Sequence, residues 1–111
     1  MNRKYRLTSA TDFKRVRRNG KSYAHPLVIV IVNPNGLSIS RFGVAAGRSV
    51  GGAVQRNRAK RLLREGIRRN LDTISGGWDV ILIARAALVA AGGAAIQEAL
   101  AELLARAGLL K

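Results

Sequence analysis

The sequence predicts a small α+β domain, one sheet with helices on one face, in the order α-β-β-(β)-α-β-α. Three observations support this class. Helical and strand-like periods alternate along the chain, 111 residues fit one domain spanning 1–111, and a hydrophobic fraction of 48% suffices for a core. Because only 5% of the residues are aromatic, aliphatic side chains are expected to fill most of that core.

The first predicted element is a short helix that follows a basic arm. Ser9 and Asp12 stand three residues apart, as in a capping box, and this spacing predicts that a helix begins here. Phe13 and Val16 then fall on one face of the helix. The pair Asn19-Gly20 tolerates left-handed backbone geometry and predicts the end of the helix.

Two strands, or three, are predicted next. Residues 22–32 are strand-like, and Pro26 indicates an edge position or a bend near the start of this run. The turn signal Asn-Pro-Asn-Gly at 33–36 separates the run from a returning strand at 39–46. If the first run bends at the proline, it supplies two strands, which accounts for the bracketed strand of the predicted order.

A long basic helix is predicted over residues 53–71, preceded by a glycine-rich loop at 47–52 that contains Arg48. Its apolar positions follow the 3.6-residue period, so one side is expected to pack on the sheet. Cationic residues cover most of the remaining surface. They are Arg56, Arg58, Lys60, Arg61, Arg64, Arg68 and Arg69.

The last two predicted elements are a strand and a helix. Residues 78–84 form an apolar run typical of a buried strand, and an alanine-rich link with two glycines follows it. Residues 94–107 repeat apolar side chains at helical spacing, with Gly108 as the expected C-cap.

The charge of the chain is strongly positive and unevenly distributed. Twenty Lys and Arg residues stand against six Asp and Glu residues, a formal net charge of +14. Seventeen of the twenty lie in residues 1–25 and 41–70, which a fold could bring onto a common surface. Since solubility alone usually mixes signs, the sequence favours a polyanionic partner over two merely solvated faces.

The residue content excludes or disfavours several classes of function. Without cysteine there is no disulfide, thiolate zinc site or cysteine nucleophile. The only histidine, His25, is expected to lie on the surface or contact a phosphate rather than act as a catalyst. The carboxylates are scattered, so no catalytic residue and no protein metal site are expected. The apolar runs are too short to cross a bilayer and the N-terminus lacks the apolar region of a secretory signal, so a cytoplasmic protein without a membrane partner is expected.

Nucleic-acid binding has the best support among the remaining functions. Arginine side chains grip phosphate oxygens bidentately, and a glycine-rich turn before a helix directs backbone amides toward an anion. A basic helix can also lie in a DNA major groove or on an anionic membrane. Both alternatives are disfavoured, because no second helix with a tight turn precedes the basic helix and its apolar stripe lacks aromatic residues. DNA is therefore not expected as a partner.

Segments along nearly the whole chain resemble the protein component of bacterial ribonuclease P. The Arg-Asn-Arg signature, with the basic residues after it, stands at 56–64. By itself that tripeptide is a weak signal, but further matching segments occur in the family's order and spacing. They are Asp-Phe-Lys-Arg-Val at 12–16, Arg-Phe-Gly-Val at 41–44, Gly-Gly-Ala-Val at 51–54 and Trp-Asp-Val-Ile-Leu-Ile-Ala-Arg at 78–85.

The resemblance implies an accessory subunit of an endoribonuclease whose catalytic part is RNA. That RNA removes the 5′ leader from precursor tRNA, and the protein binds the RNA and the single-stranded leader and improves the affinity for magnesium, which the RNA mainly holds. The implied fold is a two-layer α/β sandwich with the Arg-rich helix in a left-handed crossover between parallel strands, where general rules predict a right-handed one. The remaining alternative is a structural, ribosome-associated RNA-binding protein without a processing role.

The resemblance also assigns roles to individual residues. Phe13 would stack on bases of the leader, with simple core packing as the alternative. Arg17 and Val30 stand where many relatives have aromatic residues, so Arg17 would contact the leader by phosphate binding or guanidinium stacking, and a less aromatic groove is expected. The residues expected to bind RNA are Arg48, Arg56, Asn57, Arg58, Lys60, Arg61, Arg64 and Arg68.

Overall fold

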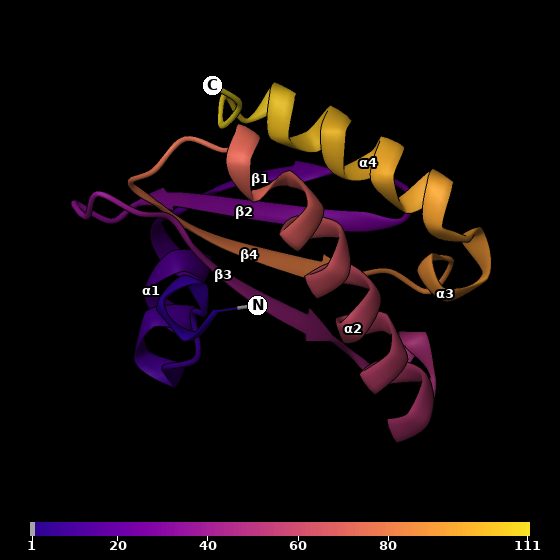
Figure 1. The fold of residues 1–111 in the computed structure, drawn as a ribbon. Coiled ribbons are helices and arrows are strands. Elements are labelled where there is room, and N and C mark those ends of the chain that lie inside the picture. The colour runs from indigo at the N-terminus through magenta and orange to yellow at the C-terminus, as the bar shows by residue number, and fades with distance from the viewer. Residues whose placement is uncertain (1) are drawn as a thin grey trace.

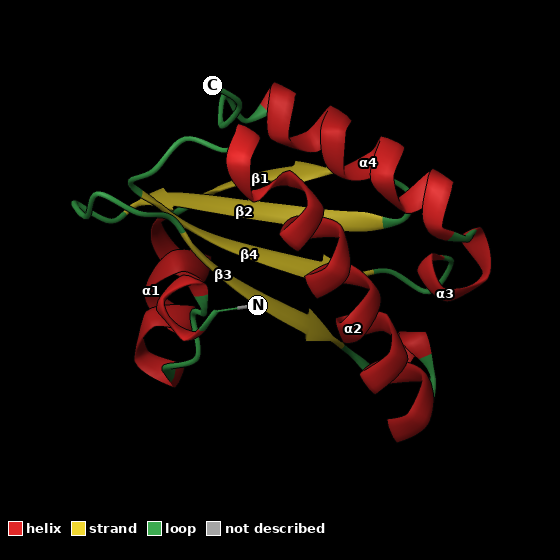
Figure 2. Ribbon diagram, in the orientation of Figure 1, coloured by secondary structure: helices red, strands yellow, loops and turns green. Residues whose placement is uncertain are grey.

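The computed structural model describes residues 2–111, which form one four-stranded sheet with helices packed against it (Figures 1 and 2). The predicted α+β class and the order of its main elements are confirmed. The predicted elements are α1 (Ala10–Asn19), β1 (Lys21–Ala24), β2 (Val28–Pro34), β3 (Arg41–Ala46), α2 (Ala53–Asn70), β4 (Trp78–Ala84) and α4 (Gly93–Arg106), and the additional short helix α3 (Leu88–Ala91) precedes α4.

The strands lie in the order β1-β2-β4-β3, so β1 and β3 are the two edges of the sheet. β2 pairs antiparallel with both β1 and β4, whereas β3 pairs parallel with β4. Parallel strands need a long connection, and α2 supplies it between β3 and β4. The left-handedness of this crossover stays a prediction.

The long strand-like run bends where the proline predicts it. β1 ends at Ala24 and β2 begins at Val28, so the bracketed strand of the predicted order is present. His25 lies in the turn between them, where its Nδ1 accepts a hydrogen bond from the Leu27 N–H at 3.0 Å. The imidazole therefore stabilises this turn.

The two faces of the sheet carry separate clusters of apolar side chains. Alternate residues of β2, such as Val28 and Val30, point toward α2 and α4 and form the main core with apolar residues of both helices. On the opposite face, Ile31 of β2 and Ile81 of β4 form a second, smaller cluster with Val16 of α1.

The position of α1 corrects the expected layering. Helices cover both faces of the sheet, since α1 lies on the face opposite to α2 and α4 (Figure 1). The periodicity of α1 indicates which of its sides is apolar but does not tell which face of the sheet that side covers. Phe13 and Val16 do share the inner side of α1, as predicted.

α1 begins and ends where the sequence predicts, but the physical reason for the glycine at its C-terminal end differs from the predicted one. Ser9 accepts a hydrogen bond from the Asp12 N–H at 3.4 Å, as in a capping box. Gly20 follows the last residue of α1 but has a φ of −79°, so left-handed geometry is not the reason for glycine there. A Cβ at Gly20 would stand 2.6 Å from the Val16 carbonyl and 2.8 Å from the Val32 carbonyl. Close packing against β2 therefore requires the glycine.

The described residues contain four short helical segments that the sequence does not predict. The 3₁₀ helices Arg3–Tyr5, Arg48–Val50 and Leu71–Thr73 precede α1, precede α2 and follow α2 respectively, and α3 lies in the alanine-rich link. Segments of three or four residues are too short to show a periodic pattern. Within residues 2–111, no helix combines the length and the apolar character needed to cross a membrane.

Candidate nucleic-acid interface

The basic residues of α2 form an exposed cationic surface. Leu63 and Ile67 are fully buried against the core and fix the helix, which turns its other sides to solvent. In the described part of the chain, none of the Lys and Arg side chains of α2 takes part in an ion pair, because the ion pairs lie in α1, β3, β4 and α4. Arg56 and Lys60 are half-buried, and the neighbouring Asn57 is exposed. The exposed basic members are Arg58, Arg61, Arg64, Arg68 and Arg69.

The expected RNA-binding residues do not form one uniform patch. Arg56, Lys60 and Arg64 recur every four residues along one flank of α2, and Arg64 lines a groove that reaches Phe13 of α1. On the opposite flank, Arg58 lines a separate hollow that extends to Arg61 and Glu65. Arg61 and Arg68, about 20° apart around the helix, lie on the solvent-facing side between the two flanks. The structure thus divides the signature between the side that faces the groove and the side that faces away.

The N-terminal end of α2 extends beyond the core. The first buried residue of the helix is Ala59, and Val54 near the start is 79% exposed. Arg48 is also exposed, in the 3₁₀ segment just before α2. This end lies at the far end of the molecule from the β2–β3 turn (Figure 1). Arg48 therefore adds its charge to the projecting end of the helix.

A groove runs between α1 and the β3 edge of the sheet, and it contains one aromatic side chain of α1. Phe13 is half-buried and lines the groove together with Phe42, Val44 and Arg64. Its ring lies directly on the backbone of β3 at Gly43, where an added Cβ would clash with the ring. Phe13 also packs against the smaller apolar cluster, so it combines core packing with a surface on the groove.

Of the two positions at which the resemblance leads us to expect further aromatics, only one lies near Phe13. Arg17 is exposed and follows Phe13 by one turn on α1. Val30 is 0% exposed and belongs to the main core on the opposite face of the sheet, so its expected place at the groove is wrong. The period of two along β2 places Ile29 and Ile31 on the α1 side instead. These residues are aliphatic too, so the sheet surface beneath α1 carries no aromatic side chain from β2.

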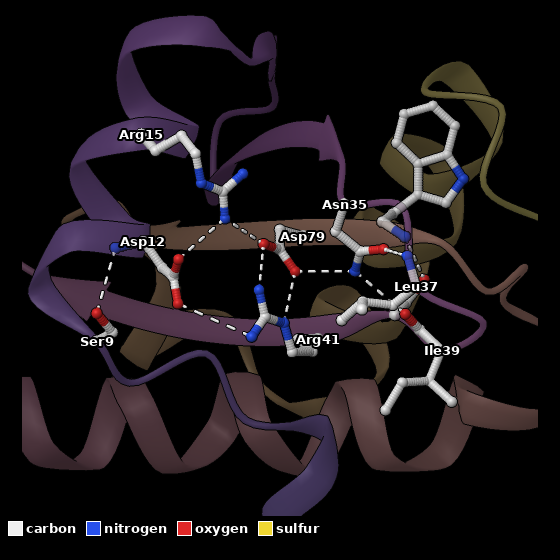
Figure 3. Close-up of polar contacts among 10 residues, drawn as sticks. Ser9, Asp12, Arg15, Asn35, Leu37, Ile39, Arg41 and Asp79 are labelled. Carbon is white, nitrogen blue, oxygen red and sulfur yellow. Dashed lines mark hydrogen bonds and ion pairs between the residues drawn. The ribbon is translucent and has the colours of Figure 1, made fainter.

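A buried carboxylate ties α1 to the sheet beside this groove. Asp79 of β4 is 0% exposed and accepts hydrogen bonds from Arg15 of α1 at 2.6 Å and from Arg41 of β3 at 2.7 and 2.9 Å (Figure 3). Asn35 in the β2–β3 turn donates a further bond at 3.0 Å. Asp12 completes the cluster through Arg15 at 3.1 Å and Arg41 at 3.8 Å.

The cluster keeps Asp79 ionised despite its burial. Burial by itself raises the pKa of a carboxyl, but the hydrogen bonds from Arg41, Asn35 and Arg15 outweigh it, and the pKa of Asp79 lies below its usual range. The hydrogen bonds to Asp79 likewise raise the pKa of Arg15 and Arg41. Two arginines are therefore held by one buried charge and are not free to bind a partner with their full charge.

This cluster could not be predicted from the sequence. Arg15 and Arg41 are separated from Asp79 by 64 and 38 positions, so no local pattern links them. One signal is available in the sequence, namely a lone carboxylate within an otherwise apolar strand. Because a buried charge is stable only with partners, such a residue predicts at least one arginine or lysine in contact with it.

The carboxylates of the described chain do not suit a magnesium ion. Magnesium requires several oxygen ligands in octahedral geometry. Residues 2–111 contain no group of three or more His, Asp or Glu side chains that could surround a metal. The oxygens of Asp79 are occupied by arginine donors. The residues present thus do not fit a magnesium ion held by the protein alone.

The fold and the site together define a small, strongly basic α+β protein with a cationic helical face suited to a polyanion. The sequence model of the family described as Ribonuclease P matches residues 1–108, and the chain belongs to this family of ribonuclease P protein components. It is therefore part of the endoribonuclease ribonucleoprotein that functions in tRNA processing, with ribonuclease P RNA as its partner.

Relatives match this chain over nearly its full length. The ribonuclease P protein component of Herpetosiphon aurantiacus is 44% identical over 98% of this chain and 89% of its own length. The ribonuclease P protein component of Dehalococcoides mccartyi is 40% identical over 95% of this chain and 86% of its own length. Among solved structures, the RNase P protein of Staphylococcus aureus is similar with a TM-score of 0.86, 30% identity and coverage of 96% of this chain and 98% of its own. The RNase P protein of Thermotoga maritima is similar with a TM-score of 0.82 and 33% identity, and the match covers 91% of this chain and 96% of its own.

Proposed function

We propose that the chain is a single RNA-binding domain that helps ribonuclease P RNA to remove the 5′ leader from precursor tRNA, by holding both the RNA and the single-stranded leader. The observation that carries the proposal is the groove that Phe13 of α1 and Arg64 of α2 both line. Such a groove suits a single strand, because unpaired bases stack on aromatic rings and phosphates bind cationic side chains. Arg17, one turn from Phe13, would contact the same strand.

The cationic surface of α2 would bind the catalytic RNA. Arg58 and Arg61 face away from the groove, so they would contact RNA phosphates outside the leader path. Lys60 and Arg64, on the groove flank, would lie between the leader and the catalytic RNA. The full set proposed for RNA contact is Arg48, Arg56, Asn57, Arg58, Lys60, Arg61, Arg64 and Arg68.

In this proposal the RNA performs the cleavage and holds the magnesium ions, with the complex acting in the cytoplasm on RNA rather than DNA. The protein contributes positive charge where RNA segments approach each other. Unpaired arginines reduce the repulsion between phosphates, which lowers the magnesium concentration needed for a compact complex. This effect requires no protein carboxylate as a metal ligand.

The proposal is tested by reconstitution with the partner RNA at low magnesium. We expect the chain to stimulate cleavage of precursor tRNA, and absence of stimulation would reject the proposal. Phe13→Leu keeps apolar bulk but removes the ring. It should weaken binding of precursor tRNA by about 1–2 kcal/mol, roughly five- to thirtyfold, because one base loses its stacking partner.

Two controls separate stacking from general damage. Binding of mature tRNA, which lacks the leader, should be unchanged in Phe13→Leu. Tyr23→Leu removes a half-buried ring on β1 and should leave both affinities unchanged. Equal losses for precursor and mature tRNA in Phe13→Leu would contradict the leader role.

A further inference from the structure

We propose that Asp79 is a positioning residue for leader recognition, because it sets the rotation of α1 about its own axis and thereby the place of the Phe13 ring. The inference rests on the proposed contact between Phe13 and the leader. Asp79 itself is fully buried and does not reach the groove. Its effect would be transmitted through Arg15 and α1.

The two ends of α1 are anchored independently of Asp79. Before the helix, the Leu7 N–H donates a hydrogen bond to the Phe42 carbonyl at 2.8 Å, and the Leu7 side chain is buried. After the helix, Gly20 packs against the backbone of β2 at Val32. With both ends held, the motion that remains for the helix is a rotation about its axis.

The contacts along α1 lie on two sides of a central buried residue. Val16 is 0% exposed and points into the sheet. At 3.6 residues per turn, Phe13 lies about 60° to one side of Val16, whereas Asp12 and Arg15 lie on the other side. Phe13 rests on β3 at Gly43, and Arg15 is bonded to Asp79. The two contacts therefore oppose each other across Val16.

Asp79 supplies the stronger of these two restraints. It holds the Arg15 guanidinium of α1 and the Arg41 guanidinium of β3 on one buried carboxylate, with distances of 2.6–2.9 Å (Figure 3). Charged hydrogen bonds of this length fix direction as well as distance. Without the charge, this side of α1 keeps only Asp12, which pairs with Arg15 of its own helix and reaches Arg41 of β3 at 3.8 Å. That longer and more exposed ion pair restrains rotation less than the buried bonds of 2.6–2.9 Å to Asp79. Because no side chain separates the Phe13 ring from the backbone at Gly43, even a small rotation changes the ring contact.

The first test needs no RNA. Asp79→Asn keeps the size of the side chain and removes its charge, and Glu98→Gln on the exposed side of α4 is the matched control with the same change in net charge. An aromatic ring shifts the NMR signals of protons beside it. We expect Asp79→Asn, but not Glu98→Gln, to change the Phe13 ring signals and the Gly43 amide signal while the helical content is retained. Unchanged signals in a folded variant would overturn the proposal.

The second test is a double-mutant cycle on the ratio of precursor to mature tRNA affinity. Asp79→Asn should lower this ratio by about threefold or more when Phe13 is present and by less than about twofold in the Phe13→Leu background, since effects carried through one residue are not additive. Equal reductions in both backgrounds, or no reduction at all, would overturn the positioning role. If Phe13→Leu alone leaves the ratio unchanged, the proposed leader contact fails instead.

Arg15→Gln provides a second variant in case Asp79→Asn does not fold. It removes the bond between α1 and Asp79 and leaves only the longer Asp12–Arg41 ion pair on this side of the helix. Asp79 stays bonded to Arg41 and Asn35, so the carboxylate keeps partners. We expect the same pattern as for Asp79→Asn, with changed Phe13 signals and a lowered precursor-to-mature ratio only when Phe13 is present. An unchanged ratio in folded Arg15→Gln would overturn the proposal.

Discussion

At the scale of single residues, Asp79 links the pH of the solution to the stability of the fold. Its pKa in the folded protein lies below that of an unfolded carboxyl, about 3.9. A group with a lowered folded-state pKa contributes stability above the unfolded pKa and loses it as the pH falls through the folded value. The contribution of Asp79 is therefore complete at neutral pH and lost in acid.

This linkage gives a measurable prediction for Asp79→Asn. At neutral pH the variant should lose about 2 kcal/mol of unfolding free energy, below the usual value for a broken buried pair because both arginines are partly exposed. The loss should shrink as the pH falls below about 4, because the unfolded chain then binds a proton that the folded carboxyl, with its lowered pKa, takes up only at still lower pH. Urea unfolding at about pH 6 and pH 3 measures both values. A difference that stays constant with pH would contradict the ionised state of Asp79.

The residues near the groove differ in how far their roles can be predicted from sequence. The resemblance singles out Phe13, and the structure places it at a groove. Nothing in the sequence predicts that its ring lies on Gly43, because the contact joins residues 30 positions apart. For Val30 the resemblance gives the wrong face of the sheet, because a shift of one residue along a strand moves a side chain to the other face.

At the scale of elements, α2 presents cations on two flanks that should contribute independently to RNA binding. Replacing Arg58 and Lys60 by alanine removes one charge from each flank. If both contact phosphates, affinity for the partner RNA should fall and the slope of log K against log salt should become shallower by about 1.5–2. Titrations at three or more salt concentrations measure the slope.

A matched control shows whether position matters. Arg85→Ala removes an exposed cation that follows β4 and lies outside α2. Its salt slope should equal that of the unaltered chain. If Arg85→Ala and the α2 variant shift the slope equally per charge removed, net charge rather than the α2 surface governs binding.

The boundaries of long periodic elements are predictable from this sequence, whereas the packing between elements is not. β4 matches the predicted strand at 78–84, and α2 ends within one residue of the predicted 53–71. Pro26 correctly marks a bend, because proline disrupts the hydrogen-bond ladder of a continuous strand. The face covered by α1 depends on Arg15 and Val16 meeting partners far along the chain, which local periodicity does not contain.

At the scale of the whole molecule, the formal charge of +14 should make stability depend on anions. Polyphosphate that binds the folded chain at ten times its Kd should add about 1.4 kcal/mol, which raises Tm by roughly 5 °C for a domain of this size. Thermal unfolding with tripolyphosphate, compared with chloride at equal ionic strength, measures the effect.

The control for this effect is a variant with less charge on the exposed helical surface. Lys60→Ala combined with Arg64→Ala should show a smaller gain in Tm from tripolyphosphate than the unaltered chain does. A Tm that responds equally to tripolyphosphate and to chloride would show that general screening, rather than binding of anions by the fold, relieves the repulsion.

The edge position of β3 has one further consequence. β3 is the last strand of the sheet, and only a short segment of the chain lies along its outer edge, where Arg6 forms a bridge to Phe42 and the Leu7 N–H donates to the Phe42 carbonyl. The trough that this segment lines together with Phe13 and Arg64 lies at the surface, so a polymer could enter it from the solvent side with no free end to thread. Under the proposed function, transcripts with short or long 5′ extensions would be accepted alike, and release would need no sliding.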